Sequence, residues 1–147
     1  MTGPRAEGAW NEATVDVLAP VAAPLRRLQS MLPPVTATSQ VIHGDLSGNV
    51  LFAPGLPPAI IDMSPYWRPA AFADAIIAVD GLLWFGGDTD LLRAATDGPD
   101  AGQMPARALI FRLIALNEHA RADPSQLRQL ARFTDAIDTV VGEDASR

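Results

Sequence analysis

Segments with a strand-like pattern are confined to one short stretch of this chain. Residues 39–42, 50–53 and 59–62 are short, apolar and rich in valine and isoleucine, and a Pro-Gly-Leu-Pro-Pro turn at residues 54–58 separates the last two. The pattern predicts three small strands, with residues 50–62 forming a hairpin. Because a few short strands cannot enclose a core, helices must provide most of it.

Helical periodicity dominates the rest of the chain. Apolar side chains recur at three- and four-residue steps in residues 11–32, where Pro20 and Pro24 predict a kink or a break. Further helices are expected at residues 69–85 before Gly86-Gly87, from a cap at Asp88 to a point before Gly98, at residues 103–121, and after a capping box at Asp123-Pro124-Ser125-Gln126. The helix over residues 103–121 is apolar on most sides, so we expect it to be central.

The two ends of the chain have a different composition. Residues 1–10 contain two glycines and one proline and are predicted to form a flexible tail, and residues 143–147 are predicted to form a polar tail. Residues 11–142 are enough for one domain with a buried core. The expected fold is α+β and mainly α, a helical bundle with a small β hairpin.

Charge and residue usage exclude several classes of function. The chain has 11 basic and 17 acidic residues, a net charge of −6, which disfavours nucleic acid and anionic membranes as partners. It has no cysteine, which excludes disulfides and thiolate chemistry, and all its basic residues are arginine, which excludes a lysine-dependent mechanism within this chain. No signal peptide is visible, and the best apolar run, residues 70–85, is too short to span a bilayer. We expect a cytoplasmic protein.

The segment that carries chemistry is Val-Ile-His-Gly-Asp-Leu-Ser-Gly-Asn-Val-Leu-Phe at residues 41–52. It places Asp45 and Asn49 in a loop between apolar strands, and the predicted hairpin brings Asp62 beside Asn49. Amide and carboxylate oxygens are ligands that Mg²⁺ accepts together with substrate phosphates. Asp45 could orient a hydroxyl nucleophile or accept its proton. Together these residues form one half of a phosphoryl-transfer site.

This segment resembles the catalytic loop and metal-binding hairpin of the aminoglycoside phosphotransferase and choline kinase-like superfamily, relatives of the protein kinases. The resemblance covers about residues 38–85, and Asp-Met-Ser-Pro-Tyr-Trp-Arg-Pro at residues 62–69 is similar to an uncharacterised actinobacterial branch. It implies a protein kinase-like C-terminal lobe. By the same resemblance, Asp45 is the catalytic aspartate, Asn49 and Asp62 hold the metal and so the cofactor, and His43 supports the loop.

The chain departs from the family pattern in three respects. Three residues separate Asp45 from Asn49 where the family has four, and Ser64 stands where kinases have glycine and many aminoglycoside enzymes have an acid. Fewer than forty residues precede the first strand, and no Gly-x-Gly-x-x-Gly occurs. The nucleotide-covering N-terminal lobe is therefore expected to be absent, leaving a truncated lobe that is weakly active or inactive alone.

The resemblance implies a phosphotransferase that uses ATP and Mg²⁺ to phosphorylate a small-molecule hydroxyl. The alternative is a non-catalytic, pseudokinase-like binding or scaffold module. In either case a partner chain or a second copy is expected on the face left by the absent lobe. A metal hydrolase using His43, Asp45, Asp62 and His119 is a third possibility, which rests on residue types alone.

Two further assignments stay open at this point. Either Asp74 or Asp80 is expected to be a buried carboxylate that supports the loop, and the apolar neighbours of Asp74 favour that residue. Tyr66, Trp67 and Arg68 either pack against the helix that follows them or form a wall for the acceptor, and packing is favoured.

Overall fold

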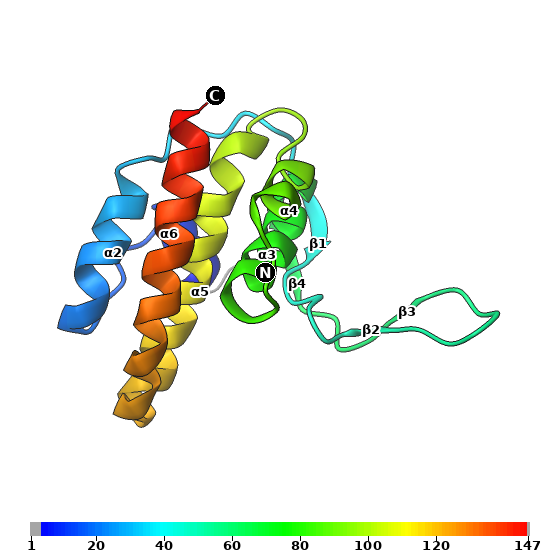
Figure 1. Ribbon diagram of the computed structural model, residues 1–147. Helices are drawn as coiled ribbons and strands as arrows, with labels where there is room; N and C mark the ends of the chain where they lie inside the picture. Colours follow the sequence, from blue (N-terminus) through cyan, green and yellow to red (C-terminus); the bar gives the residue numbers. More distant parts are fainter. Residues whose placement is uncertain (1–3, 147) are drawn as a thin grey trace.

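The computed structural model describes residues 4–146, which form a mainly helical α+β fold. The helices stand side by side, and a thin β ribbon runs along one flank and projects beyond it (Figure 1). In chain order the elements are α1 Pro4–Ala9, α2 Ala19–Gln29, β1 Gln40–His43, β2 Val50–Leu51, β3 Ala59–Ile60, β4 Pro65–Arg68, α3 Ala70–Trp84, α4 Thr89–Ala94, the 3-10 helix η1 Ala101–Gln103, α5 Met104–Ala122, the 3-10 helix η2 Pro124–Gln129 and α6 Leu130–Ala145.

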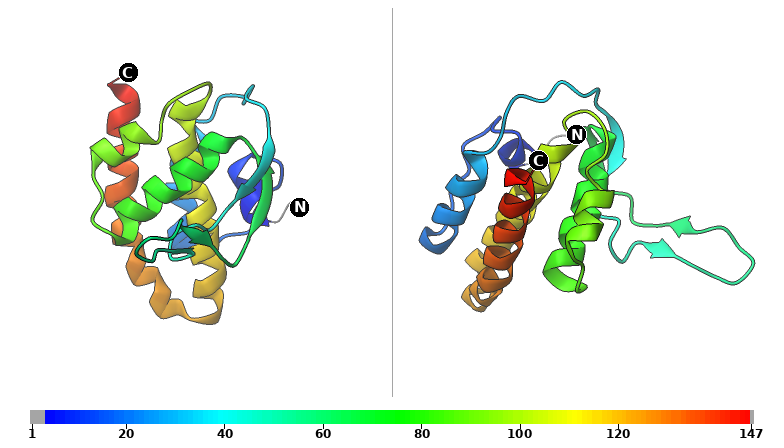
Figure 2. Two further views of the ribbon diagram at one scale, coloured as in Figure 1. Left: turned by 90° about the vertical axis from the view of Figure 1, so that its right-hand side faces the viewer. Right: turned by 45° about the horizontal axis from the view of Figure 1, so that its top comes forward.

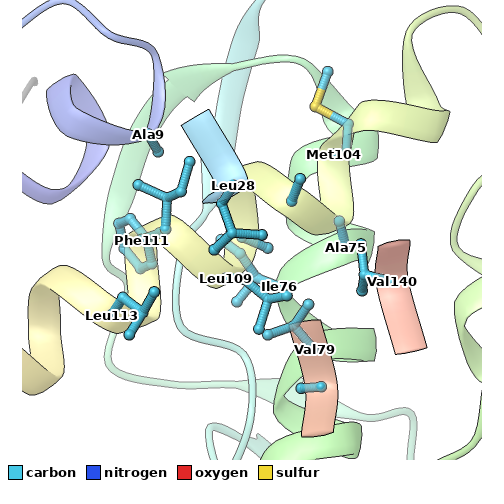
Figure 3. Packing of buried hydrophobic residues seen from close by; sticks show 14 of the residues in the cluster. Ala9, Leu28, Ala75, Ile76, Val79, Met104, Leu109, Phe111, Leu113 and Val140 are labelled. Carbon is cyan, nitrogen blue, oxygen red and sulfur yellow. The ribbon is translucent and has the colours of Figure 1, made fainter. Parts of the chain in front are cut away.

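Helix α5 is the centre of the molecule, as its all-round apolar sequence predicts. It packs against α1, α2, α3 and α6, and every residue from Met104 to Asn117 is buried. Side chains from α2, α3, α5 and α6 meet in one continuous cluster that fills the interior (Figure 3). Phe72 and Phe111, both fully buried, meet edge to face with ring centroids 5.9 Å apart.

The predicted flexible tail at residues 1–10 was wrong for the part that the structure describes. Residues 4–9 form helix α1, which packs on α5 and buries Ala6 and Ala9. Trp10 follows, edge to face with Phe72 at 4.6 Å. The buried Arg107 donates to the carbonyl of Ala9 at 2.8 Å, and burial lowers the pKa of this guanidinium. Residues 1–3 lie outside the described residues.

Several other boundaries differ from the sequence predictions. The helix expected from Asn11 begins only at Ala19. Pro20 lies in its first turn, where a backbone nitrogen has no partner within the helix, so the missing N–H of proline costs nothing. Asp88 caps α4 as predicted, by accepting from the N–H groups of Asp90 and Leu91. Asp123 caps a 3-10 helix instead of the expected α-helix, and α6 continues to Ala145 through much of the predicted polar tail.

The β strands form two nested antiparallel pairs. Strand β1 pairs with β4, so that Val41 lies opposite Trp67, and β2 pairs with β3, so that Val50 lies opposite Ile60. The hairpin over residues 50–62 was predicted; the pairing of β1 with β4 was not. The outer pair rests on α3, and the inner pair extends away from the helices (Figure 2).

Candidate functional site

The candidate site is a bulge between the two strand pairs. Six residues, 44–49, connect β1 to β2, whereas only four, 61–64, connect β3 to β4. Both ends of the bulge are closed by backbone hydrogen bonds, from Gly44 N–H to the Ser64 carbonyl at 2.8 Å and from Ile61 N–H to the Asn49 carbonyl at 3.0 Å. The longer connection therefore loops out and displays its polar side chains.

His43 holds this loop from beneath. Its ring is buried, and Nδ1 accepts a hydrogen bond from the backbone N–H of Asp45 at 3.0 Å. Its Nε2 lies 3.2 Å from the carbonyl oxygen of Ile61 on the opposite connection. These partners assign the neutral tautomer with the proton on Nε2. The histidine thus links the two sides of the bulge at the position of Asp45.

Asn49 and Asp62 lie at the far end of the bulge. Asn49 donates from Nδ2 to the Asp45 carbonyl at 2.7 Å, which leaves its Oδ1 without a donor among the described residues. Asp62 follows Ile61, whose N–H donates to the Asn49 carbonyl. The Asp62 carboxylate is exposed and pairs with no described side chain. Asp62 also has φ of 49°, a left-handed conformation that aspartate tolerates better than most residues. The backbone thus brings Asn49 and Asp62 close together, as the predicted hairpin implies.

The carboxylate of Asp45 is held by an arginine that sequence reasoning missed. Arg112, from the centre of α5, donates from Nη2 to Asp45 Oδ1 at 3.0 Å. The same guanidinium binds the buried Asp80 on α3 through two hydrogen bonds of 2.7 and 2.6 Å. Burial alone would lower the pKa of Arg112, but its hydrogen bonds and charge interactions with Asp80 and Asp45 outweigh burial and raise it. Arg112 is therefore a fixed positive charge under the loop.

A second contact ties the loop to the same network. Ser47 donates its hydroxyl proton to Asp80 Oδ2 at 2.6 Å. Asp80, not Asp74, is thus the buried carboxylate that supports the loop, and it does so through side chains and not through loop N–H groups. Asp74 is exposed on α3, so the sequence-based preference for it was wrong. A charged residue within the apolar run Ala-Leu-Ile-Phe-Arg-Leu-Ile-Ala-Leu at residues 108–116 was the signal that could have identified the network.

The last three residues of β4 have different environments. Tyr66 meets Phe111 edge to face at 5.5 Å, and the buried Arg68 pairs with Glu12 at 2.6 Å and lies over the ring of Trp10 at 4.7 Å. Tyr66 and Arg68 are thus both occupied by contacts within the fold. Trp67 is 56% exposed on the outer face of the ribbon, so among the three it is the residue that a ligand can reach.

The structure does not assemble the site of the hydrolase alternative. Within residues 4–146, no three histidine or carboxylate side chains gather as a metal site. His119 lies in the last turn of α5 and is exposed. The oxygen pair of Asn49 and Asp62 is a different kind of donor set, which suits a cation that keeps water and phosphate ligands.

Comparisons with known proteins add no relative. No family model, no curated protein and no solved structure matches this chain. In the part of the chain that the structure describes, no helix combines the length and apolar character needed to cross a membrane.

Proposed function

We propose that this chain carries the acceptor and metal half of a phosphotransferase site, which transfers phosphate from Mg²⁺-ATP to a hydroxyl group of a small molecule. One observation carries the proposal: a single bulge displays Asp45 and, at its other end, the unpaired oxygens of Asn49 and Asp62. The resemblance of residues 38–85 to aminoglycoside phosphotransferases and choline kinases supports the same assignment of roles.

Asp45 would act on the acceptor. Arg112 occupies its Oδ1, whereas its Oδ2 accepts no hydrogen bond from a described residue. That free oxygen can accept the proton of a substrate hydroxyl and so orient the nucleophile. Arg112 holds the carboxylate in place, so the main contribution of Asp45 is to orient the acceptor hydroxyl.

Asn49 and Asp62 would hold the metal. Their amide and carboxylate oxygens fit Mg²⁺, which takes few protein ligands and completes its shell with water and phosphate oxygens. When bound, the ion would neutralise charge on the transferred phosphoryl group. The structure describes no glycine-rich loop over this site, and the chain has no lysine. The groups that cover the nucleotide would therefore have to come from outside residues 4–146.

A non-catalytic module is the second candidate, and a specific observation favours it. Arg112 pairs with the carboxylate that the reaction would use, and Asp80, which binds both Arg112 and Ser47, ties the loop to the core. A non-catalytic protein in which the loop serves only as structural support would retain these hydrogen bonds and would bind neither metal nor nucleotide.

Calorimetric titration of ATP with and without Mg²⁺ separates these candidates. For a phosphotransferase half-site we expect Mg²⁺-dependent binding that weakens about tenfold or more in Asp62→Ala, because a metal ligand is lost. Asp74→Ala removes an equal charge from an exposed helical position and should bind like the wild type. If wild type shows no binding in either condition, the phosphotransferase assignment fails for this chain and the non-catalytic module is favoured.

A second measurement tests Asp45. Provided that Mg²⁺-ATP binds, Asp45→Asn should keep that binding and lose phosphate transfer to alcohol acceptors by about a hundredfold or more, since the side chain acts on the acceptor. Equal transfer by wild type and Asp45→Asn would contradict its role.

A further inference from the structure

The β ribbon displays exposed apolar side chains, both on the hairpin and on the outer strand pair, for which the described residues provide no cover. We define the ribbon patch as Val41, Phe52, Leu56, Ile60, Met63 and Trp67. Their side chains are between 54% and 79% exposed. Val41 and Trp67 are direct partners across β1 and β4, so they lie on one face of the outer strand pair. The other members lie on the hairpin or on the connection that returns from it.

The hairpin itself lacks support from the body of the molecule. Strands β2 and β3 pair with each other and pack extensively against no described helix. The views of the ribbon show this segment extending away from the helices (Figures 1 and 2). An isolated two-stranded hairpin is at best marginally stable in water. Exposed apolar side chains on such an arm are typical of a surface that becomes buried in an assembly.

The charge distribution indicates which partner fits. Residues 50–61 contain no acidic, basic or histidine side chain, although the chain as a whole carries a net charge of −6. A basic partner would be attracted to the acidic parts of the surface, not to this one. A second copy of the chain is equally acidic, and it can approach without like-charge repulsion only through an uncharged surface.

The size of the ribbon patch is also sufficient. With about 150–250 Å² for an aromatic side chain and less for an aliphatic one, the exposed fractions correspond to at most roughly 700 Å² of surface. A stable interface buries about 800 Å² on each partner. A two-fold contact uses the same patch twice, so each copy would supply nearly the whole of the area that is needed.

We propose that the ribbon patch is the contact surface between two copies of this chain, with the hairpin at its centre. The proposal does not rest on phosphotransferase activity. It places the second copy next to the loop that carries Asp45.

Sedimentation velocity of the purified chain over a wide range of concentration tests the proposal. We expect a monomer–dimer equilibrium whose dissociation constant increases about tenfold or more in Phe52→Asp, because a charge would be buried at the contact. Ala131→Asp is the matched control. It adds the same charge at an exposed position near the start of α6 and should leave the dissociation constant unchanged. Circular dichroism at a concentration where both variants are monomeric should show equal thermal stability for the two.

Two outcomes would overturn the proposal. One is a wild-type chain that stays monomeric at every concentration. Such a monomer overturns the proposal even if its hairpin binds neutral phosphatidylcholine vesicles. The other is a dimer that Phe52→Asp does not weaken. These measurements contain neither Mg²⁺ nor ATP, so their outcome is independent of the calorimetric test of the proposed function.

Discussion

Asp80 and Arg112 determine the electrostatics beneath the loop. Asp80 is almost completely buried, and its two oxygens bind one guanidinium and one hydroxyl. A buried ion pair of this kind adds little net stability, but removing one partner leaves the other as an uncompensated buried charge. The site therefore requires both Asp80 and Arg112.

This requirement yields a prediction. Asp80→Ala should reduce the free energy of unfolding by about 3–5 kcal/mol, because Arg112 would remain buried without its main partner. Asp74→Ala lies on the same helix but is exposed, so it should change stability by no more than about 0.5 kcal/mol. Urea unfolding of both variants measures the difference. Equal stability of the two would mean that the ion pair is not buried in solution.

Asp100 gives a prediction for pH. The N–H groups of Thr36 and Ala37 and the Thr36 hydroxyl donate to its carboxylate, which lowers the pKa of Asp100 from its usual value of 3.8. A lowered pKa in the folded state means that this carboxylate stabilises the protein above pH 3.8, and that the stabilisation is lost as pH falls below 3.8 through the folded value.

The matched variant is Asp100→Asn, since asparagine also tolerates the left-handed backbone at this position, where φ is 60°. Thermal unfolding between neutral pH and pH 3 should show that wild type loses more stability on acidification than Asp100→Asn does. Parallel pH curves for the two proteins would contradict the role of this carboxylate.

At the scale of elements, the bulge depends on a close approach between its first residue, Gly44, and strand β4. A Cβ atom added to Gly44 would lie 2.4 Å from the Tyr66 ring, and that ring already packs against Phe111. The ring cannot move without disturbing the contact between β4 and α5. Glycine is therefore required here for space and not for its backbone freedom.

Gly44→Ala should accordingly cost about 1–3 kcal/mol of stability. Gly102→Ala is the control, because a Cβ added in η1 meets no atom within 4 Å, and it should stay within about 0.5 kcal/mol of the wild type. Chemical denaturation of the two variants provides the measurement, and a Gly44→Ala protein as stable as the control would show that the bulge has room to adjust.

At the scale of the whole molecule, stability is distributed unevenly. Helix α5 contacts α1, α2, α3 and α6, whereas β2 and β3 contact chiefly each other. Opening the amides in the middle of α5 therefore requires unfolding of the whole domain, and opening the hairpin does not.

Hydrogen exchange followed by mass spectrometry should show this difference directly. We expect the slowest exchange in residues 106–117 and exchange close to that of an unfolded chain in residues 50–60, measured at a concentration where the chain is monomeric. Protection of the hairpin that appears only at higher concentration would accord with burial in a dimer. Fast exchange throughout α5 would contradict its place at the centre of the core.

The sequence by itself determined the local features whose causes are local. Apolar periodicity located α3, α5 and much of α6, Asp88 identified its cap, and the proline-rich turn at residues 54–58 identified the hairpin. The same patterns placed Asp45 and Asn49 in one loop and Asp62 at the end of the return strand. These predictions succeeded because each depends on backbone preferences and side-chain spacing within a few residues.

The tertiary structure alone decided the features that depend on distant partners. Residues 4–9 look like a tail until α5 provides a surface for Ala6 and Ala9. Asp74 and Asp80 both lie on α3, and only the position of Arg112, 32 residues beyond Asp80, shows which one is buried and paired. Burial of a charge is a property of the packed molecule, because its free energy depends on which partner the fold places within hydrogen-bond distance.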